Sequence, residues 1–373
     1  MRLALIARRF DPAGGGTERD LLVTAEGLLR AGHEVTIYAA EVRKPTRRWR
    51  IVQVGTSWLS PSLGLWRFAW AAPAMARRDG ADLVISFARA VGADVLRSGG
   101  GAHVAYLRAA RRWRGRAAAS AMHLRPYHRV QMAVERAGFT SPALRLAIAV
   151  SKLVRKELIA EFELAPEKVA TLYNGVNLER FHPVADRATR VGLRQAFQAD
   201  TGAPVVAFVG NGFARKGLAP LLKACSAMET RPFLLIAGSD RAAIRYIRLA
   251  HRLGIDDRVR FLGAQEQIER VLHASDALAL PSFFEPFGNV VMEALASGIG
   301  ALASAQCGVA ELMPPLLQHL VVEDPADSGE IANGLDALVQ SGRELGEAAR
   351  AAAAGYTWER YANGLLALIN SLA

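Results

Sequence analysis

Short apolar runs alternate along the chain with glycine-containing loops and amphipathic stretches. The first run, Leu3 to Ala7, is followed by three glycines at 14–16, a helical pattern over 17–30 and a second apolar run over 35–38. A strand, a glycine loop, a helix and a strand in this order are typical of the start of a doubly wound α/β domain. Further strands of this domain are predicted over 82–87, 146–150 and 169–173.

The same order recurs in the second half of the chain. A β-branched run over 205–209 precedes a glycine-containing loop over 210–217 and a helical pattern over 218–227. The pattern also predicts strands over 233–237, 259–262 and 277–280, and helices over 241–253, 268–274 and 348–354. The fold class is therefore predicted to be α/β, with two Rossmann-like doubly wound domains joined by a connector over 174–204.

Length and composition agree with two globular domains. The chain has 373 residues, 51% of them hydrophobic and 22% charged, and its mean hydropathy is +0.13. The richest apolar stretch, over 58–75, is interrupted by Pro61, Arg67 and Pro73, whereas a membrane-spanning helix needs about 20 cleaner residues. The first residues contain Arg8 and Arg9 and no cleavage pattern, so no signal peptide is expected. We expect a cytoplasmic protein.

The chain has only two cysteines, Cys225 and Cys307. Two cysteines cannot cross-link a chain of this size, and their number fits a reducing compartment. Neither a disulfide nor a metal role is expected for them.

Positive charge is concentrated in one segment. The formal net charge is +11, and no Asp or Glu occurs between Asp94 and Glu135. The arginines in that interval are Arg97, Arg108, Arg111, Arg112, Arg114, Arg116, Arg125 and Arg129. Such a segment attracts polyanions, and the aromatic residues interspersed in it favour a membrane interface. The alternative is a solvated arginine-rich face. No recognition motif points to nucleic acid. We expect Arg108–Arg129 to meet an anionic membrane surface, as in a peripheral protein on the inner face of the cytoplasmic membrane.

Two glycine loops are candidate phosphate sites. The loop at 14–16 follows a strand and opens a helix, so its backbone amides can approach a diphosphate. It lacks the G-x-G-x-x-G spacing of dinucleotide-binding domains. In the second loop, Arg215 and Lys216 stand directly before a helix, where the helix dipole disfavours cations by ~0.3–1 kcal/mol. A bound anion would remove that conflict, although a solvent-exposed pair is the alternative.

Two glutamates flank a Pro-x-Gly loop. Glu285 precedes the loop, and Glu293 follows after seven intervening residues, within an apolar helical pattern. A carboxylate on such a face is costly unless it accepts hydrogen bonds, which a vicinal diol such as a ribose supplies. A half-exposed helix glutamate is the structural alternative.

These motifs together resemble the retaining glycosyltransferases of family 4, which have the GT-B fold. The resemblance covers nearly the whole chain and rests on Glu285-x7-Glu293, Arg215-Lys216-Gly217 and Gly15-Gly16. Within the family, the segment from Gly15 to Asp20, His103 and the Arg-Lys-Gly motif are most similar to the lipopolysaccharide core glucosyltransferase I group.

The resemblance implies a domain organisation. Residues 1–180 would form an N-terminal acceptor-binding domain, and 181–355 a C-terminal domain that binds the nucleotide sugar. Residues 356–373 would form a helix that crosses back to the N-terminal domain. The two Rossmann-like domains would face each other across a cleft.

The resemblance also implies roles for individual residues. Arg215 and Lys216 would neutralise the leaving diphosphate, Glu285 would bind the transferred sugar, and His103 would lie against that sugar. Glu293 would hold the ribose, and Asp20 would lie near the acceptor. The other implied donor-binding residues are Gly15, Gly16, Asn211, Phe287, Gly288 and Asn289.

The implied reaction transfers a hexose, glucose in particular, from a UDP-sugar to a lipopolysaccharide-core or other cell-envelope glycan or lipid acceptor. No D-x-D pair occurs in the chain, so metal-independent transfer is expected. Two positions depart from the pattern: Gly100 stands where this group commonly has Asp, and Gly298-Ile299-Gly300 replaces a Gly-x-Pro turn. A GT-B-fold nucleotide-sugar epimerase and a non-catalytic anion-binding scaffold are the alternative functions.

Overall fold

The computed structural model describes residues 1–12, 16–44, 46, 48–55, 60–199 and 202–372. These residues form two compact units. The first unit contains Met1–Arg111, Arg116–Gly175 and the chain from Trp358 onward, whereas Val176–Thr357 and the short Arg112–Gly115 segment group as the second.

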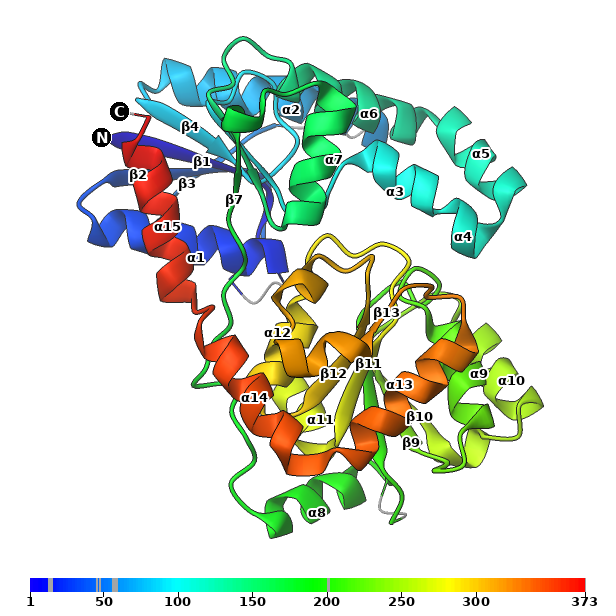
Figure 1. Ribbon diagram of the computed structural model, residues 1–373. Coiled ribbons are helices and arrows are strands. Elements are labelled where there is room, and N and C mark those ends of the chain that lie inside the picture. Colours follow the sequence, from blue (N-terminus) through cyan, green and yellow to red (C-terminus); the bar gives the residue numbers. More distant parts are fainter. Residues whose placement is uncertain (13–15, 45, 47, 56–59, 200–201, 373) are drawn as a thin grey trace. The chain divides into compact units, whose positions relative to one another are not determined.

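A parallel sheet forms the centre of the first unit (Figure 1). In the described residues it has seven strands in the order β3-β2-β1-β4-β5-β6-β7. The strands are β1 (Arg2–Phe10), β2 (Glu34–Val42), β3 (Arg50–Gln53), β4 (Leu83–Ser86), β5 (Val95–Ser98), β6 (Leu146–Ala149) and β7 (Val169–Thr171). The residues of β4, β5 and β6 are all buried, as expected for parallel strands covered on both faces.

Helices flank this sheet. They are α1 (Gly16–Arg30), α2 (Pro61–Arg78), α3 (His103–Ala109), α4 (Arg111–Arg114), α5 (Arg116–Leu124), α6 (Pro126–Phe139), α7 (Lys152–Phe162) and α15 (Trp358–Asn370), with a short 3₁₀ helix at Pro166–Lys168. The apolar stretch weighed above as a membrane span is largely α2, which runs through Pro73. No helix in the described ranges is long and apolar enough to cross a membrane.

The C-terminal helix α15 packs beside α1, although the two are at opposite ends of the sequence (Figure 1). Tyr361, Leu365 and Ile369 recur every four residues and therefore lie on one face of α15. They join the core of the first unit together with Leu21 and Ala25 of α1. Burial of this apolar stripe attaches the end of the chain to the first unit.

A buried arginine holds together four segments of the first unit. Arg97 in β5 has an NH2 group 2.9 Å from Asp20 Oδ2 in α1, and it donates to Asn174 Oδ1 at 2.5 Å. Its guanidinium carbon also lies 5.6 Å from the ring centre of Phe87 and 5.6 Å from that of Tyr361. The side chains of Arg97 and Asp20 are only 1% and 4% exposed. The pair thus links α1, β5, α15 and the chain just before the second unit.

The second unit is built around another parallel sheet. Over the described ranges it has six strands in the order β10-β9-β8-β11-β12-β13. They are β8 (Val205–Val209), β9 (Phe233–Ala237), β10 (Val259–Gly263), β11 (Ala277–Leu280), β12 (Gly300–Ser304) and β13 (Val321–Val322). The chain leaves β8 toward one edge, returns to β11 on the other side of β8, and continues toward the opposite edge. This reversal is the topological switch point at which doubly wound sheets bind ligands.

The α-helices of the second unit are α8 (Arg187–Ala196), α9 (Leu218–Ala227), α10 (Ala243–Arg252), α11 (Ile268–Ala274), α12 (Asn289–Ala296), α13 (Ser328–Gln340) and α14 (Gly342–Ala354). Its 3₁₀ helices are Asp256–Arg258, Gly308–Leu312 and Pro315–Leu320. The predicted connector contains a helix that the sequence reading missed. This helix, α8, is capped by Asp186 and held by Arg194, which donates to Asp276 Oδ2 at 2.6 Å. Asp276 lies far along the chain, so the sequence pattern did not indicate its contact with Arg194.

Loss of the Arg97 guanidinium should strongly destabilise the protein. Arg97→Met leaves the Asp20 carboxylate buried without its cation, which costs roughly 3 to 5 kcal/mol in free energy of unfolding. Urea unfolding measures the change. The control is Arg2→Met, which removes the partner of Asp82 from a largely exposed pair and should shift the midpoint little.

Equal small shifts in the two variants would contradict a buried, structurally required pair. If Arg97→Met does not fold, the double variant Asp20→Asn/Arg97→Met should recover folded protein, because it removes the uncompensated charge.

Candidate active site

Two loops meet at the switch point of the second sheet. Residues 210–217 follow β8, and 281–288 follow the neighbouring strand β11. The backbone N–H of Phe283 donates to the carbonyl oxygen of Arg215 at 2.8 Å, which joins the loops directly. Gly217 has φ +79°, and a Cβ there would lie 2.0 Å from the carbonyl oxygen of Pro281. Only glycine therefore allows this approach.

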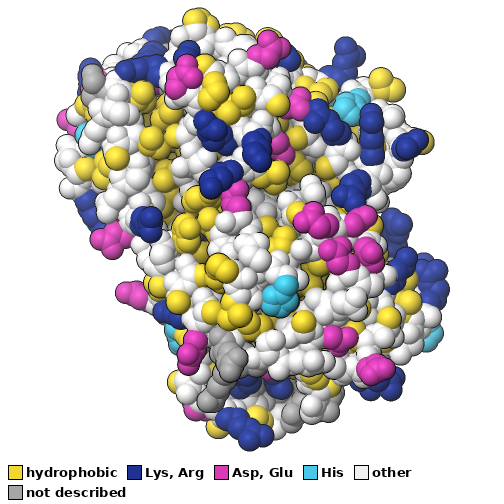
Figure 2. Space-filling model, viewed as in Figure 1, with side chains coloured by type: hydrophobic (Ala, Val, Ile, Leu, Met, Phe, Trp, Pro, Cys, Tyr) yellow, Lys and Arg dark blue, Asp and Glu magenta, His cyan; other side chains and the backbone are white. Residues whose placement is uncertain are grey.

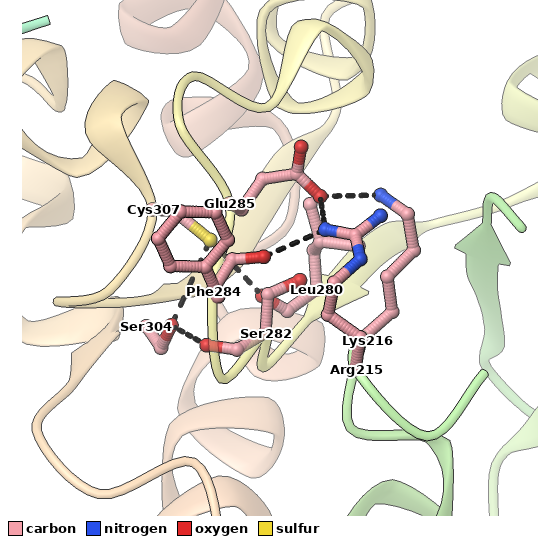
Figure 3. Close-up of polar contacts among 8 residues, drawn as sticks. All are labelled: Arg215, Lys216, Leu280, Ser282, Phe284, Glu285, Ser304 and Cys307. Carbon is pink, nitrogen blue, oxygen red and sulfur yellow. Dashed lines mark hydrogen bonds and ion pairs between the residues drawn. The ribbon is translucent and has the colours of Figure 1, made fainter. Parts of the chain in front are cut away.

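Arg215, Lys216 and Glu285 form one cluster where the loops meet (Figure 3). Lys216 Nζ donates to Glu285 Oε2 at 2.6 Å, and Arg215 NH1 donates to the same oxygen at 3.0 Å. Arg215 NH1 also donates to the carbonyl oxygen of Phe284 at 2.6 Å. Two cations share one carboxylate, so the cluster carries an excess positive charge that favours an anion.

Backbone pairing holds Glu285 in place. Its N–H donates to the carbonyl oxygen of Gln306 at 3.1 Å, and its carbonyl oxygen accepts from Gly308 N–H at 2.9 Å. Nearby, the hydroxyl of Ser304 donates to the carbonyl oxygen of Ser282 at 2.5 Å (Figure 3). The turn after β12 thus supports the loop that carries Glu285, so the carboxylate is preorganised.

The electrostatics of Glu285 depend on its two partners. Burial by itself raises the pKa of this carboxyl, but Lys216 and Arg215 outweigh burial and lower the pKa to about 2. The group is therefore ionised near neutral pH. Both printed bonds end on Oε2, and Figure 3 shows the other oxygen pointing away from the two cations. That second oxygen is oriented to accept a hydrogen bond from a hydroxyl group.

Two helices begin at this end of the sheet. Gly217 is the N-cap of α9, and Gly288 is the N-cap of α12. Glycine has no side chain with which to cap the first-turn N–H groups, and the partial positive charge of each helix start favours an anion nearby. Phe287 and Asn289 flank the second of these caps. Glu293 lies in α12 and is half-buried.

Asn211 connects the loop after β8 to the loop after β9. Its Oδ1 accepts a hydrogen bond from Ser239 N–H at 2.8 Å. In the same region, Phe213 N–H donates to Asp240 Oδ2 at 2.8 Å. Asn211 therefore shapes the loop, and Asp240 is a supporting residue that no local motif indicated.

The remaining predicted residues belong to the first unit. Gly15 lies outside the described residues, and Gly16 is the first residue of α1. Asp20 is held by Arg97, as described above.

His103 begins α3 and is buried. Its Nε2 lies 2.9 Å from His128 Nδ1, and its N–H donates to Glu135 Oε2 at 2.7 Å. Burial, followed by nearby Arg89 and His128, lowers the pKa of His103 to about 3, so its ring is neutral at pH 7. His128 and Glu135 come from α6, and sequence spacing could not link them to His103.

Two Rossmann-like units, with a cluster of excess positive charge at a switch point in one of them, are typical of α/β proteins that bind phosphorylated ligands. Two protein-family models match the two halves of the chain and define the class of protein more closely. "Glycosyltransferase Family 4" matches residues 14–180, and "Glycosyl transferases group 1" matches 192–357. The chain belongs to this family of glycosyltransferases.

Solved structures share the fold over the full chain. WaaG, described as a glycosyltransferase involved in lipopolysaccharide biosynthesis, aligns with a TM-score of 0.81 at 20% identity, covering 97% of this chain and 98% of that one. HepE from Anabaena, solved in complex with UDP-glucose, aligns with a TM-score of 0.76 at 17% identity, covering 100% of both chains. These likenesses confirm the predicted GT-B fold.

Curated relatives match in part. An uncharacterized glycosyltransferase of Methanocaldococcus jannaschii is 28% identical over 196 residues, which are 52% of this chain and 50% of the relative. A D-inositol 3-phosphate glycosyltransferase of Corynebacterium diphtheriae is 33% identical over 223 residues, covering 56% of this chain and 52% of that protein. The chain spans about half the length of these relatives.

The depressed pKa of Glu285 predicts a specific pH dependence of stability. A pKa lowered from 4.5 to about 2 stabilises the fold above pH 4.5, and this contribution is lost as the pH falls toward 2. Between pH 6 and pH 4 the wild type should therefore lose about 1 kcal/mol more free energy of unfolding than Glu285→Gln.

Urea unfolding of both proteins at several pH values tests this expectation. Titrations common to the two chains cancel in the difference. Parallel pH curves would show that the cations do not stabilise the ionised carboxylate.

Proposed function

We propose that this chain transfers a hexose from a nucleotide sugar, glucose from UDP-glucose in particular, to a cell-envelope glycan or lipid acceptor. The observation that carries the proposal is the cluster of Arg215, Lys216 and Glu285 at the switch point of the second sheet. It combines excess positive charge, the starts of two helices and an ionised carboxylate with one oxygen that points away from the cations. A sugar attached to a diphosphate matches all three features.

Each part of the donor has a proposed partner. Arg215 and Lys216 bind the diphosphate, and the backbone around Gly288 contributes N–H groups from the start of α12. The outward oxygen of Glu285 accepts a hydroxyl of the sugar. Glu293, in the helix α12 that follows this loop, accepts hydrogen bonds from the ribose diol. Asn211 acts on the donor by holding the loop after β8 in shape.

The cluster also suits the chemistry of transfer. As the bond between the anomeric carbon and the phosphate oxygen breaks, negative charge grows on the departing diphosphate and positive charge grows on the sugar. Lys216 and Arg215 stabilise the growing negative charge on the diphosphate, and the ionised Glu285 lies on the side of the growing positive charge on the sugar. Fixed donors of this kind are worth about 3 kcal/mol each in a transition state. These residues supply the charge without requiring a metal.

Acceptor and stereochemistry rest on the family resemblance. We propose retention of the anomeric configuration, with His103 against the sugar and Gly15 and Gly16 closing on the diphosphate. Asp20 is proposed on the acceptor side, where it would act through its place beside Arg97. WaaG is described as acting in lipopolysaccharide biosynthesis, and this supports a lipopolysaccharide-core acceptor. Gly100 removes a carboxylate on that side, so the acceptor chemistry differs from the group's pattern.

The basic segment Arg108–Arg129 supports the proposal that the protein associates with a membrane surface. Arg111, Arg114 and Arg116 are exposed on α4 and α5, and Lys and Arg side chains gather over these helices in Figure 2. Each arginine near an anionic bilayer contributes about 1 kcal/mol. We propose that Arg108–Arg129 brings the protein to the cytoplasmic face of a membrane that contains its acceptor.

Removal of the Lys216 charge should impair transfer while leaving the fold intact. Lys216→Met should lower the rate of UDP release from UDP-glucose at least about tenfold, because the leaving diphosphate loses a preorganised cation. The matched control is Lys223→Met, an exposed lysine in the following helix α9, which should keep the wild-type rate.

A thermal-shift panel of nucleotide sugars with the wild type identifies the donor first. A ligand at 100 times its dissociation constant stabilises the fold by about 2.7 kcal/mol. The proposal fails if no nucleotide sugar stabilises the protein, or if Lys216→Met turns over normally.

Neutralising the basic segment should weaken binding to anionic membranes. Arg111→Gln/Arg114→Gln/Arg116→Gln should sediment less with phosphatidylglycerol vesicles, because three contributions of about 1 kcal/mol are lost. The control, Arg30→Gln/Arg43→Gln/Arg50→Gln, loses the same net charge elsewhere in the first unit. Equal sedimentation of the two variants would exclude a specific role for the segment.

A further inference from the structure

A second basic surface lies on the second unit, around α10 (Ala243–Arg252). Arg245, Arg248 and Arg252 are exposed and spaced three and four residues apart, so they form one stripe along the helix. Arg241, in the turn before the helix, extends the stripe by one more turn. Lys and Arg side chains stand together over α10 at the right-hand edge of the face drawn in Figure 2.

Apolar side chains run beside the arginines. Ile244 is 52% exposed and Ile247 is 42% exposed. They lie three residues apart, next to the stripe, and the sequence of α10 contains no Asp or Glu. Isoleucines that contact only water do not stabilise the protein. A face of isoleucine beside arginine is typical of helices that lie in a membrane interface.

The acidic residues at the ends of α10 are already engaged. Asp240 accepts from the N–H of Phe213 at 2.8 Å and from the N–H of Ala242 at 2.7 Å. Asp256 lies 3.3 Å from His251 Nδ1. Four arginines, Arg241, Arg245, Arg248 and Arg252, still outnumber the three carboxylates at the ends of the helix, Asp240, Asp256 and Asp257.

The opposite face of α10 is anchored next to the donor loop. Tyr246 and Ala250 are buried. The ring of Tyr246 lies 5.5 Å from that of Phe213 at an interplanar angle of 83°, and Phe213 also packs against Phe208 and Phe261. Phe213 belongs to the same loop as Arg215 and Lys216. The inner face of α10 therefore packs on the aromatic cluster around Phe213, which also supports the loop of the candidate active site.

We propose that the exposed face of α10 is a membrane-docking surface, which binds an anionic lipid bilayer through Arg241, Arg245, Arg248 and Arg252 and inserts Ile244 and Ile247 among the lipid headgroups. The arginines match the charge of the phosphates, and the isoleucines match the apolar layer beneath them. A nucleic acid would use the charge but not the isoleucines, and the aromatic residue of α10 is buried and cannot stack on a base. The surface lies on the second unit, is formed by a helix outside Arg108–Arg129, and is independent of the proposed sugar transfer.

The arginine contribution is tested with the full chain and mixed phosphatidylglycerol and phosphatidylcholine vesicles. Arg248→Gln/Arg252→Gln should lower the partition coefficient about thirtyfold, as expected for two arginines near an anionic surface. The control Arg187→Gln/Arg270→Gln removes two exposed arginines from α8 and α11 of the same unit, and it should change partitioning much less. Equal effects of the two double variants would overturn the proposal, because net charge alone would then explain binding.

The isoleucine contribution separates a bilayer from other polyanions. Ile244→Ser/Ile247→Ser keeps every charge and should still lower vesicle partitioning severalfold, at salt concentrations that screen the arginines. Its affinity for single-stranded RNA should equal that of the wild type. Unchanged vesicle binding in this variant would overturn membrane docking. So would an arginine variant that loses RNA binding while keeping vesicle binding. Thermal midpoints equal to that of the wild type confirm that the variants are folded.

Discussion

The ion cluster of Lys216, Arg215 and Glu285 is the interaction on which the second unit's site depends. It requires two strands that are far apart in sequence to be neighbours in the sheet, and two loops to approach within contact distance. Glycine makes that approach possible: a Cβ at Gly210 would lie 2.3 Å from Lys216 Cε, and one at Gly217 would meet the backbone of Pro281. The cluster also depends on the turn after β12, which holds Glu285 by its backbone. The strand order and the glycine positions of the second unit therefore also determine the geometry of the cluster.

Two of the buried charge groups in the described residues differ in how well their charges are balanced. Arg97 has one carboxylate partner, an amide and two aromatic faces, so its charge is fully compensated inside the first unit. Glu285 has two cations, which leaves one positive charge over. A compensated buried pair mainly specifies how segments fit together, whereas an uncompensated one attracts a ligand of opposite sign. Asp20 and Glu285 were both predicted as site residues, and their partners now give them different physical roles.

Sequence patterning predicted several short apolar strands and missed elements of several kinds, including the long helices α2 and α13. The strands at 205–209, 233–237 and 277–280 were each predicted with the boundaries that the structure has, because β-branched and apolar runs bounded by glycine or proline are distinctive. In contrast, β12 consists of small residues and α8 is mostly polar, so neither stood out. The supporting residues Asp240, His128 and Arg97 were missed as partners because each one acts on a residue from a distant element.

The sequence by itself indicated the family, the two α/β halves and residue types suited to a diphosphate, because glycine loops, paired cations and spaced glutamates are local patterns. Only the tertiary structure decided which of these residues touch. It brought Lys216 and Glu285 within 2.6 Å, buried Asp20 against Arg97, and set His103 beside His128. It also showed that the arginines and isoleucines of α10 share one exposed face above a buried Tyr246. The physical reason is that charge and hydrogen-bond energies depend on distance and burial, and both are set by strand order and packing rather than by neighbours in the chain.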